Sequence, residues 1–296
     1  MGLYCHAGVG GNFMKKVFFP LLTALILSLI ALVRTDGFSI GKIHGKLLEG
    51  EANSTSDEIQ IKLDQQYRYL AKGRQCFVFA SDDGKYVIKF LNYNRFYFPD
   101  APILPDSWCE YGKRRRNRFQ KTVESFKLAF EHLSQETGIE YLHLQHGSHL
   151  PTIELVGPAG ALCKVDLNSV AFVFQKRADA SIFEKLSHLA KEGGEEKLQE
   201  ALAKILSLLC RRCSLGIADD DRDIEINFGF MGDTPLLIDP GRLFLEEDLK
   251  TKEGMRLEMA AATKKLHRWL SLNYPSSAAW LKSRMTSESG VSENEL

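Results

Sequence analysis

The spacing of apolar residues changes along this chain, and that change constrains the fold more than any other feature. Around 77–80 and 86–90, β-forming apolar residues flank the turn sequence Asp-Asp-Gly-Lys at 82–85, which predicts a β-hairpin. Between 113 and 135 the spacing becomes that of a helix. The apolar stripe of this predicted helix consists of Phe119, Val123, Phe126, Phe130 and Leu133. Strand spacing followed by helical spacing predicts an α+β chain.

The rest of the chain extends this order. Two more β runs are predicted near 162–165 and 170–174, and the helical stretch after them is closed by Gly216. One face of that stretch carries Leu198, Leu202, Ile205 and Leu209. A last helical stretch, from about 253 to 284, is interrupted at Pro275. We therefore expect a small antiparallel β lobe followed by a helical lobe. The expected boundaries are a linker at 34–57, the β lobe at 58–178, the helical lobe at 179–285 and a disordered tail at 286–296.

The N-terminal region differs in kind from the rest. Residues 17–33 form an uninterrupted apolar run preceded by Lys15 and Lys16, at the short limit for a membrane-spanning helix. A signal peptide is the alternative, but no small-x-small cleavage site follows the run, so we expect an uncleaved single-pass anchor behind a leader at 1–16. Met14 is an alternative start. The side of the membrane stays open, because basic residues lie both before and after the run.

Composition excludes some classes of function. Lys+Arg and Asp+Glu both number 38 among 296 residues, so the net charge is zero and no nucleic-acid partner is expected. The six cysteines are scattered, which is not a disulfide framework in a chain of this length. Cys210 and Cys213 form a lone C-x-x-C pair in a helical pattern, and we expect them to be packing residues.

Asn227 and Asp239 are the most informative pair of polar residues. They flank a predicted hairpin whose turn, Gly-Asp-Thr-Pro at 232–235, contains the midpoint of the two positions, residue 233. Residues equidistant from the turn of an antiparallel hairpin lie opposite each other. An amide oxygen beside a carboxylate suits a hard cation such as Mg²⁺.

The motifs before this pair resemble those of the protein-kinase-like superfamily. The kinase glycine-rich loop, G-x-G-x-x-G-x-V, corresponds here to Ala71, Gly73, Cys76 and Val78, so only its central glycine is kept. Lys89 follows Val87 and Ile88 and matches the lysine of the V-A-I-K strand. The resemblance covers roughly residues 67–270 and includes Asp239-Pro240-Gly241 in place of D-F-G.

The resemblance implies a nucleotide site that uses ATP and Mg²⁺. It implies that Gly73, Val78 and Lys89 contact the nucleotide, and that Asn227 and Asp239 hold Mg²⁺. The helix glutamate that pairs with the kinase lysine would be Glu124, with Glu131 as its alternative. An alternative interpretation is that these two glutamates are ordinary solvent-exposed residues near lysines.

The catalytic base departs from the kinase pattern. The H-R-D-x-x-x-x-N motif places the base aspartate five residues before Asn227, at Arg222. Asp221 and Asp223 are each one residue away from that position. We choose Asp221, because a loop longer by one residue can still direct it at the hydroxyl that is phosphorylated.

Three functions follow as hypotheses. The first is a membrane-anchored kinase-like enzyme that transfers a phosphoryl group to an unknown acceptor, either a protein or a small molecule. The second is a pseudokinase scaffold, favoured by the altered glycine loop and the displaced base. The third is an envelope-anchored interaction protein without a nucleotide site, in which Lys89 is a surface residue and the Asn227/Asp239 pair belongs to a turn.

Overall fold

A computed structural model of the chain describes residues 18, 20–29, 35–50, 53–97, 105–147 and 149–288. Within these ranges, no helix is both long and apolar enough to cross a membrane. The predicted membrane segment 17–33 lies partly outside them, and its residues 20–29 are helical. The predicted leader 1–16 and the last part of the predicted tail, 289–296, also lie outside the described residues.

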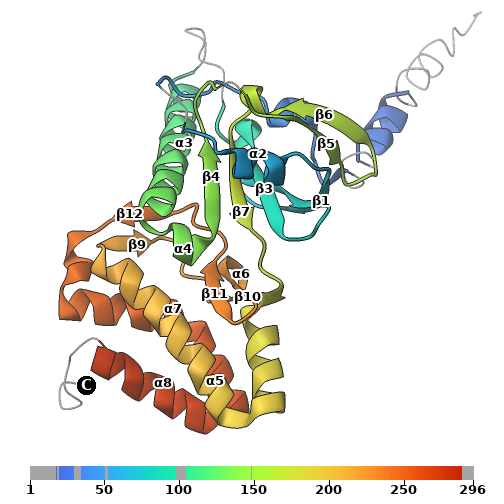
Figure 1. Ribbon diagram of the computed structural model, residues 1–296. Coiled ribbons are helices and arrows are strands. Elements are labelled where there is room, and N and C mark those ends of the chain that lie inside the picture. Colours follow the sequence, from blue (N-terminus) through green and yellow to red (C-terminus); the bar gives the residue numbers. More distant parts are fainter. Residues whose placement is uncertain are drawn as a thin grey trace, which may run out of the picture.

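A seven-stranded sheet dominates the first half of the chain and curls into a half-barrel (Figure 1). Its strands are β1 (Tyr67–Lys72), β2 (Cys76–Ser81), β3 (Tyr86–Leu91), β4 (Ile139–His143), β5 (Thr152–Val156), β6 (Leu162–Asp166) and β7 (Phe172–Lys176), in the order β4-β7-β3-β2-β1-β5-β6. The hairpin predicted at 77–90 is confirmed as β2 and β3, with Gly84 at φ +72° in its turn. The sheet is mixed rather than purely antiparallel, because β5 pairs parallel to β1 and adds the β5–β6 hairpin to that edge.

The two faces of the sheet bury different side chains. Alternate positions of β2 and β3, including Phe77, Phe79, Ile88 and Phe90, form one hydrophobic core on the face away from α3. The chain before β1 closes this core with η1 (Ile40–Lys42), α2 (Asp57–Leu63) and buried side chains such as Ile43 and Leu63. The segment 34–57, expected as a linker, therefore packs on the sheet in its described part.

Helix α3 (Asp106–His132) lies along the sheet and reaches the second half of the molecule (Figure 1). It follows η2 (Tyr93–Arg95) and begins at residue 106, seven positions before the start predicted at 113. Its stripe is confirmed, since Val123, Phe126 and Leu133 are buried and Phe119 and Phe130 pack against the same core. A short α4 (Ser134–Thr137) follows, and Gly138 ends it in the left-handed region at φ +68°.

The second half is mostly helical, as predicted. A capping box formed by Ser181 and Glu184 starts the long helix α5 (Ile182–Ser214), and Gly216 follows its end at φ +69°. Helices α7 (Lys252–Asn273) and α8 (Pro275–Glu288) pack on α5 and on each other, separated at Pro275 as expected. The remaining elements are η3 (Leu167–Ser169), β8 (Ala180–Ser181), β9 (Ile217–Asp219), α6 (Ile224–Asn227), β10 (Phe228–Met231), β11 (Thr234–Leu237), β12 (Leu243–Leu245) and η4 (Glu247–Lys250).

These short strands form two small sheets. One has the order β11-β10-β8 and the other pairs β12 with β9. Together with the large sheet and the helices they confirm the predicted α+β class. We call residues 35–176 the sheet part and residues 180–288 the helical part.

Candidate functional site

A cavity of about 340 Å³ lies between the two parts. The β1–β2 loop contributes Gly73, Arg74 and Gln75 to its wall. The loop between β9 and β10 and the turn after β11 provide the other walls. The residues from these two segments that matter below are Asp221, Asn227, Asp239 and Arg242. Four positions singled out from the sequence, Gly73, Asp221, Asn227 and Asp239, thus line one cavity.

The hairpin that carries Asn227 has a different register from the predicted one. Strands β10 and β11 pair Met231 with Thr234, so the turn has two residues, Gly232 and Asp233, and its centre lies between them, half a position before the expected centre at residue 233. Asn227 consequently lies opposite Ile238 rather than opposite Asp239. The Asn227 carbonyl still accepts from both N–H groups, at 2.7 Å from Ile238 and 3.3 Å from Asp239. The two side chains therefore remain neighbours.

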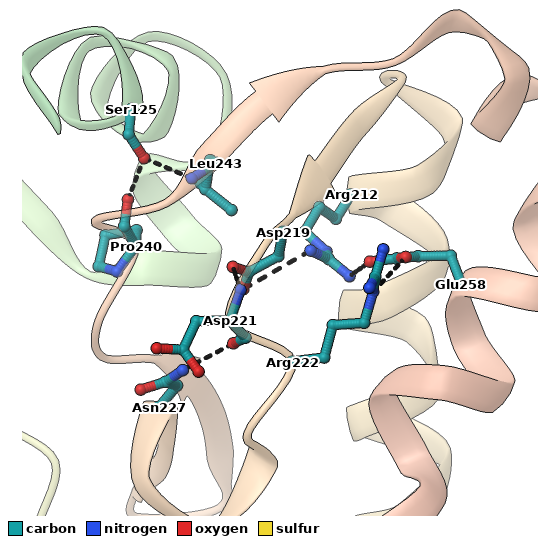
Figure 2. Close-up of polar contacts among 9 residues, drawn as sticks. All are labelled: Ser125, Arg212, Asp219, Asp221, Arg222, Asn227, Pro240, Leu243 and Glu258. Carbon is teal, nitrogen blue, oxygen red and sulfur yellow. Dashed lines mark hydrogen bonds and ion pairs between the residues drawn. The ribbon is translucent and has the colours of Figure 1, made fainter. Parts of the chain in front are cut away.

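The Asn227 side chain fixes the loop that carries Asp221. Its amide Nδ2 donates to the Asp221 carbonyl at 2.7 Å (Figure 2). The Asp221 N–H in turn donates to Asp219 Oδ1 at 2.8 Å. Asp221 is therefore held through both of its backbone groups, while its carboxylate faces the cavity and ion-pairs with Arg242, Nη1 to Oδ2 3.4 Å.

A buried ion-pair network supports this loop from behind (Figure 2). Arg212 of α5 lies 2.6 Å from Glu258 of α7 and 3.7 Å from Asp219, and all three side chains are buried. Glu258 also pairs with Arg222, the residue after Asp221, at 2.7 Å. Burial raises the pKa of Asp219 to about 6, against the opposing charge of Arg212. The network anchors the loop on both sides of Asp221.

Lys89 lies on the face of the sheet that turns toward the cavity. It is paired with Val78 of β2 and Val173 of β7, and only 8% of the residue is exposed. Its ammonium group donates to the Ile238 carbonyl. Burial lowers the pKa of Lys89, and the negative charge of Asp239 opposes that shift. Lys89 thus has a buried amino group that contacts the turn of Asp239, and it does not lie on a solvated face.

The structure does not bring Glu124 to Lys89. Glu124 is exposed on α3, and among the described residues no ion pair joins it to the lysine. Glu131, the alternative, is exposed and lies 3.9 Å from His132. The physical reason is helix phase, because α3 turns Thr122 and Ser125 toward the site and Glu124 away from it.

Ser125 ties α3 to the turn that carries Asp239. Its buried hydroxyl donates to the Pro240 carbonyl and accepts from the Leu243 N–H at 2.6 Å (Figure 2). The turn is therefore fixed to the sheet part by side-chain bonds. The ring of Pro240 fixes its own φ and restricts the same turn further.

Gln75 ties the β1–β2 loop to the same turn. Its amide donates to the Gly241 carbonyl at 2.8 Å and to the Thr122 hydroxyl at 3.2 Å. A Cβ on Gly241 would lie 2.3 Å from Gln75 Oε1, so this close approach requires glycine unless the glutamine moves. Of the other loop positions, Cys76 is buried and its pKa is raised to about 12, which excludes a reactive thiolate there.

Sequence reasoning missed Arg74, Gln75, Ser125 and Arg242. Arg74 and Gln75 follow the retained glycine directly, and Arg242 follows Gly241 directly. A basic side chain thus lies next to each predicted phosphate or metal motif in the sequence. This adjacency is the signal that could have identified the two arginines. Ser125 carries no such signal, because only the phase of α3 relative to the turn shows its contact.

The donor set fits one divalent cation in part. The Asp239 carboxylate accepts no hydrogen bond from the described residues, and Asn227, which lines the same cavity, uses its amide nitrogen for Asp221 and keeps its amide oxygen available. Hard cations take such oxygen ligands. Among the described residues, no group of three or more His, Cys, Asp and Glu side chains could hold a metal ion. A cation here would therefore need further oxygens from a bound phosphate.

Comparison with protein-family models and with curated proteins finds no match to this chain.

Proposed function

We propose that this protein is a two-lobed, kinase-like phosphotransferase that uses ATP and Mg²⁺. The observation that carries the proposal is that Asp221, Asn227 and Asp239 line one cavity, while Lys89 contacts the backbone next to Asp239. A carboxylate for proton acceptance, two oxygen ligands and a buried cation are the parts that phosphoryl transfer requires.

The order of these parts along the fold supports the kinase-like assignment. A loop between two strands lines the cavity, and the next strand carries the buried Lys89. A long helix follows, and the asparagine and aspartate come later from the helical part. Protein kinases place the glycine-rich loop, the β3 lysine, a helix, the catalytic-loop asparagine and the D-F-G aspartate in this order.

The proposed reaction transfers the γ-phosphoryl group of ATP to a hydroxyl. The bond between the γ-phosphorus and the bridging oxygen to the β-phosphate breaks, and a new bond forms between the γ-phosphorus and the acceptor oxygen. The acceptor proton passes to the Asp221 carboxylate, and ADP leaves with the bridging oxygen. Lys89 provides positive charge beside the phosphates. Mg²⁺ held by Asn227 and Asp239 would neutralise phosphate charge.

The location of the protein is part of the proposal. The apolar run 17–33 would hold the protein at a membrane as a single-pass anchor. Catalysis then requires that the residues after this run face a compartment that contains ATP. The acceptor is a hydroxyl-bearing protein or small molecule.

Nucleotide binding without transfer is the second candidate. It is favoured by the β1–β2 loop, where the Gly73 N–H is bonded to the Cys76 carbonyl at 2.9 Å and is not directed at a phosphate. A pseudokinase scaffold would use the same cavity and lack turnover. An interaction protein without a nucleotide site, the third possibility, would not bind nucleotide at all.

The test measures melting temperature with and without Mg·ATP, using the full chain in detergent micelles. We expect a Mg²⁺-dependent rise in the parent, and its loss in Lys89→Met and in Asp239→Asn. Asp233→Asn is the matched control, because Asp233 is exposed in the turn of the same hairpin and lies outside the cavity. It should retain the full rise.

The same samples separate the candidates. ADP formation in the parent, lost in Asp221→Asn, supports the enzyme. A rise in melting temperature without ADP formation, under any acceptor tried, favours the scaffold. No rise in a folded parent contradicts both nucleotide-binding candidates.

A further inference from the structure

One backbone N–H, one backbone carbonyl and one side chain of the β1–β2 loop already make hydrogen bonds within the protein. The Gly73 N–H donates to the Cys76 carbonyl at 2.9 Å, and the Gln75 carbonyl accepts from the Asn92 N–H at 2.7 Å. The Gln75 side chain is bonded to Gly241 and Thr122. The N–H of the one glycine kept from the glycine-rich pattern is therefore already used within the protein and is not free to bind a phosphate.

Two arginines line the cavity where such donors would otherwise be required. Arg74 lies at the tip of the loop, is exposed, and has no hydrogen bond or ion pair with another described residue. Arg242 follows the Asp239 turn, and its Nη1 lies 3.4 Å from Asp221 Oδ2, with a third of the side chain exposed. The two arginines therefore line one cavity, Arg74 from the sheet part and Arg242 from the helical part.

The cavity offers guanidinium donors to an anion. Arg74 and Arg242 line it together with Asp221 and Asp239, so the charges of the lining balance, and a divalent cation bound at the carboxylates would leave an excess of positive charge for a phosphate. Guanidinium groups bind phosphate oxygens through paired N–H donors and stay protonated at all relevant pH values.

Building on the proposed function, we propose that Arg74 and Arg242 bind the phosphate chain of the nucleotide in place of a glycine-rich backbone cradle. Arg242 exchanges the Asp221 carboxylate for a phosphate oxygen when the nucleotide enters. The exchange releases Asp221 for the acceptor hydroxyl. Asp221 therefore becomes free to act as the base only after the nucleotide has bound.

The first experiment measures dissociation constants for two probes, Mg·ATP and Mg·tripolyphosphate, on the full chain in micelles. Tripolyphosphate has the phosphate chain but no nucleoside, so it isolates contacts to phosphate. We expect Arg74→Gln and Arg242→Gln to weaken both probes by at least about tenfold each, since each removes charge-assisted hydrogen bonds. Arg118→Gln, an exposed arginine of α3 outside the cavity, is the matched control and should leave both constants unchanged.

A double-mutant cycle tests the exchange. Asp221→Asn removes the ion-pair partner of Arg242, so it should tighten both probes in the parent background. That gain should fall when Arg242 is already glutamine, and it should persist when Arg74 is glutamine, because Arg242 forms an ion pair with Asp221 and Arg74 has none among the described residues. If Arg242 had only a structural role, Arg242→Gln would lower the stability of the protein but would not change the effect of Asp221→Asn on the dissociation constants.

The outcomes distinguish the inference from the proposed function. Binding of both probes by the parent, with constants unchanged in Arg74→Gln and Arg242→Gln, overturns the arginine clamp and leaves the nucleotide site in place. No binding of either probe by a folded parent overturns both. If Arg242→Gln does not fold, Arg242→Lys replaces it, and full binding by that variant together with unchanged Arg74→Gln overturns the clamp as well.

Discussion

At the scale of single residues, His143 shows the cost of burying a titratable group. It lies in β4 and is fully buried, with its ring 5.3 Å from that of Phe172 and 6.2 Å from that of Tyr141. Among the described residues, neither ring nitrogen has a hydrogen-bond partner. Burial lowers the pKa of His143 and the charge of His146 lowers it further, while the Asn168 backbone and Asp166 oppose the shift.

This environment predicts loss of stability in mild acid. The folded-state pKa lies below the unfolded value of about 6.5, so the unfolded chain binds more protons between the two values. The contribution of His143 is fully present above about pH 6.5 and is lost as the pH falls through the lowered pKa. The raised pKa of Asp219 acts in the opposite direction over this range, so the prediction concerns the difference between variants. We expect His143→Phe, which keeps the ring packing, to lose less of its urea midpoint than the parent as the pH falls from 7 to 5. Exposed His188→Gln is the control, and an equal slope in parent and His143→Phe would contradict the prediction.

The types of residue and their order in the sequence predict much of the site. The direction in which a side chain points from its helix cannot be predicted in the same way. The order of Lys89, Asn227 and Asp239 along the chain is what predicts them as site residues. In the structure Asn227 and Asp239 line one cavity with Asp221, and Lys89 contacts the Ile238 carbonyl next to Asp239. Glu124 was a poor choice, since an unknown helix phase leaves several positions equally plausible.

At the scale of elements, the strongest local signals predicted the structure best. The hairpin of β2 and β3 and the helix α3 follow from turn residues and apolar spacing within short windows. The sequence does not predict β4, because it is short and its partner β7 lies far away along the chain, and it does not predict β5, which is short although its hairpin partner β6 follows directly. The one-residue register difference at β10 and β11 depends on the turn, which has two central residues, Gly232 and Asp233.

Helix α5 contains a break at Gly194. The sign of the change in the free energy of unfolding on Gly194→Ala tests whether this break exists. Gly194 has φ 69° and ψ −164°, a conformation nearly restricted to glycine, and no described atom would lie within 4 Å of an added Cβ. In a continuous helix Gly→Ala stabilises by about 0.5–1 kcal/mol. Here we expect Gly194→Ala to lower the free energy of unfolding by about 1–3 kcal/mol, because the backbone alone opposes the side chain.

Chemical denaturation of the full chain measures this change. Gly41→Ala is the matched control, since a Cβ at Gly41 also meets open space and its φ is not positive. Stabilisation by Gly194→Ala would show that α5 runs straight through residue 194.

At the scale of the whole molecule, two kinds of contact join the sheet part to the helical part. One hydrophobic core runs through both, from Phe126 of α3 to Leu202 of α5 and Leu266 of α7. The polar ties meet at the turn after β11, where Lys89 contacts Ile238 and Ser125 contacts Pro240. The polar contacts that join the two parts therefore lie at the same turn that lines the cavity.

Ser125 is the tie whose removal should separate these contributions. Ser125→Ala leaves the Pro240 carbonyl and the Leu243 N–H without their side-chain partner in a buried position. An unsatisfied buried polar group costs about 1–3 kcal/mol, so we expect the free energy of unfolding to fall by about that amount. Ser214→Ala is the control, because that hydroxyl is exposed and bonds only within the last turn of α5, so the change should be within about 0.5 kcal/mol. The Asp239 turn should also loosen, so faster amide exchange at Leu243 in Ser125→Ala is the second readout. Unchanged exchange together with unchanged stability would mean that the apolar core alone sets the arrangement of the two parts.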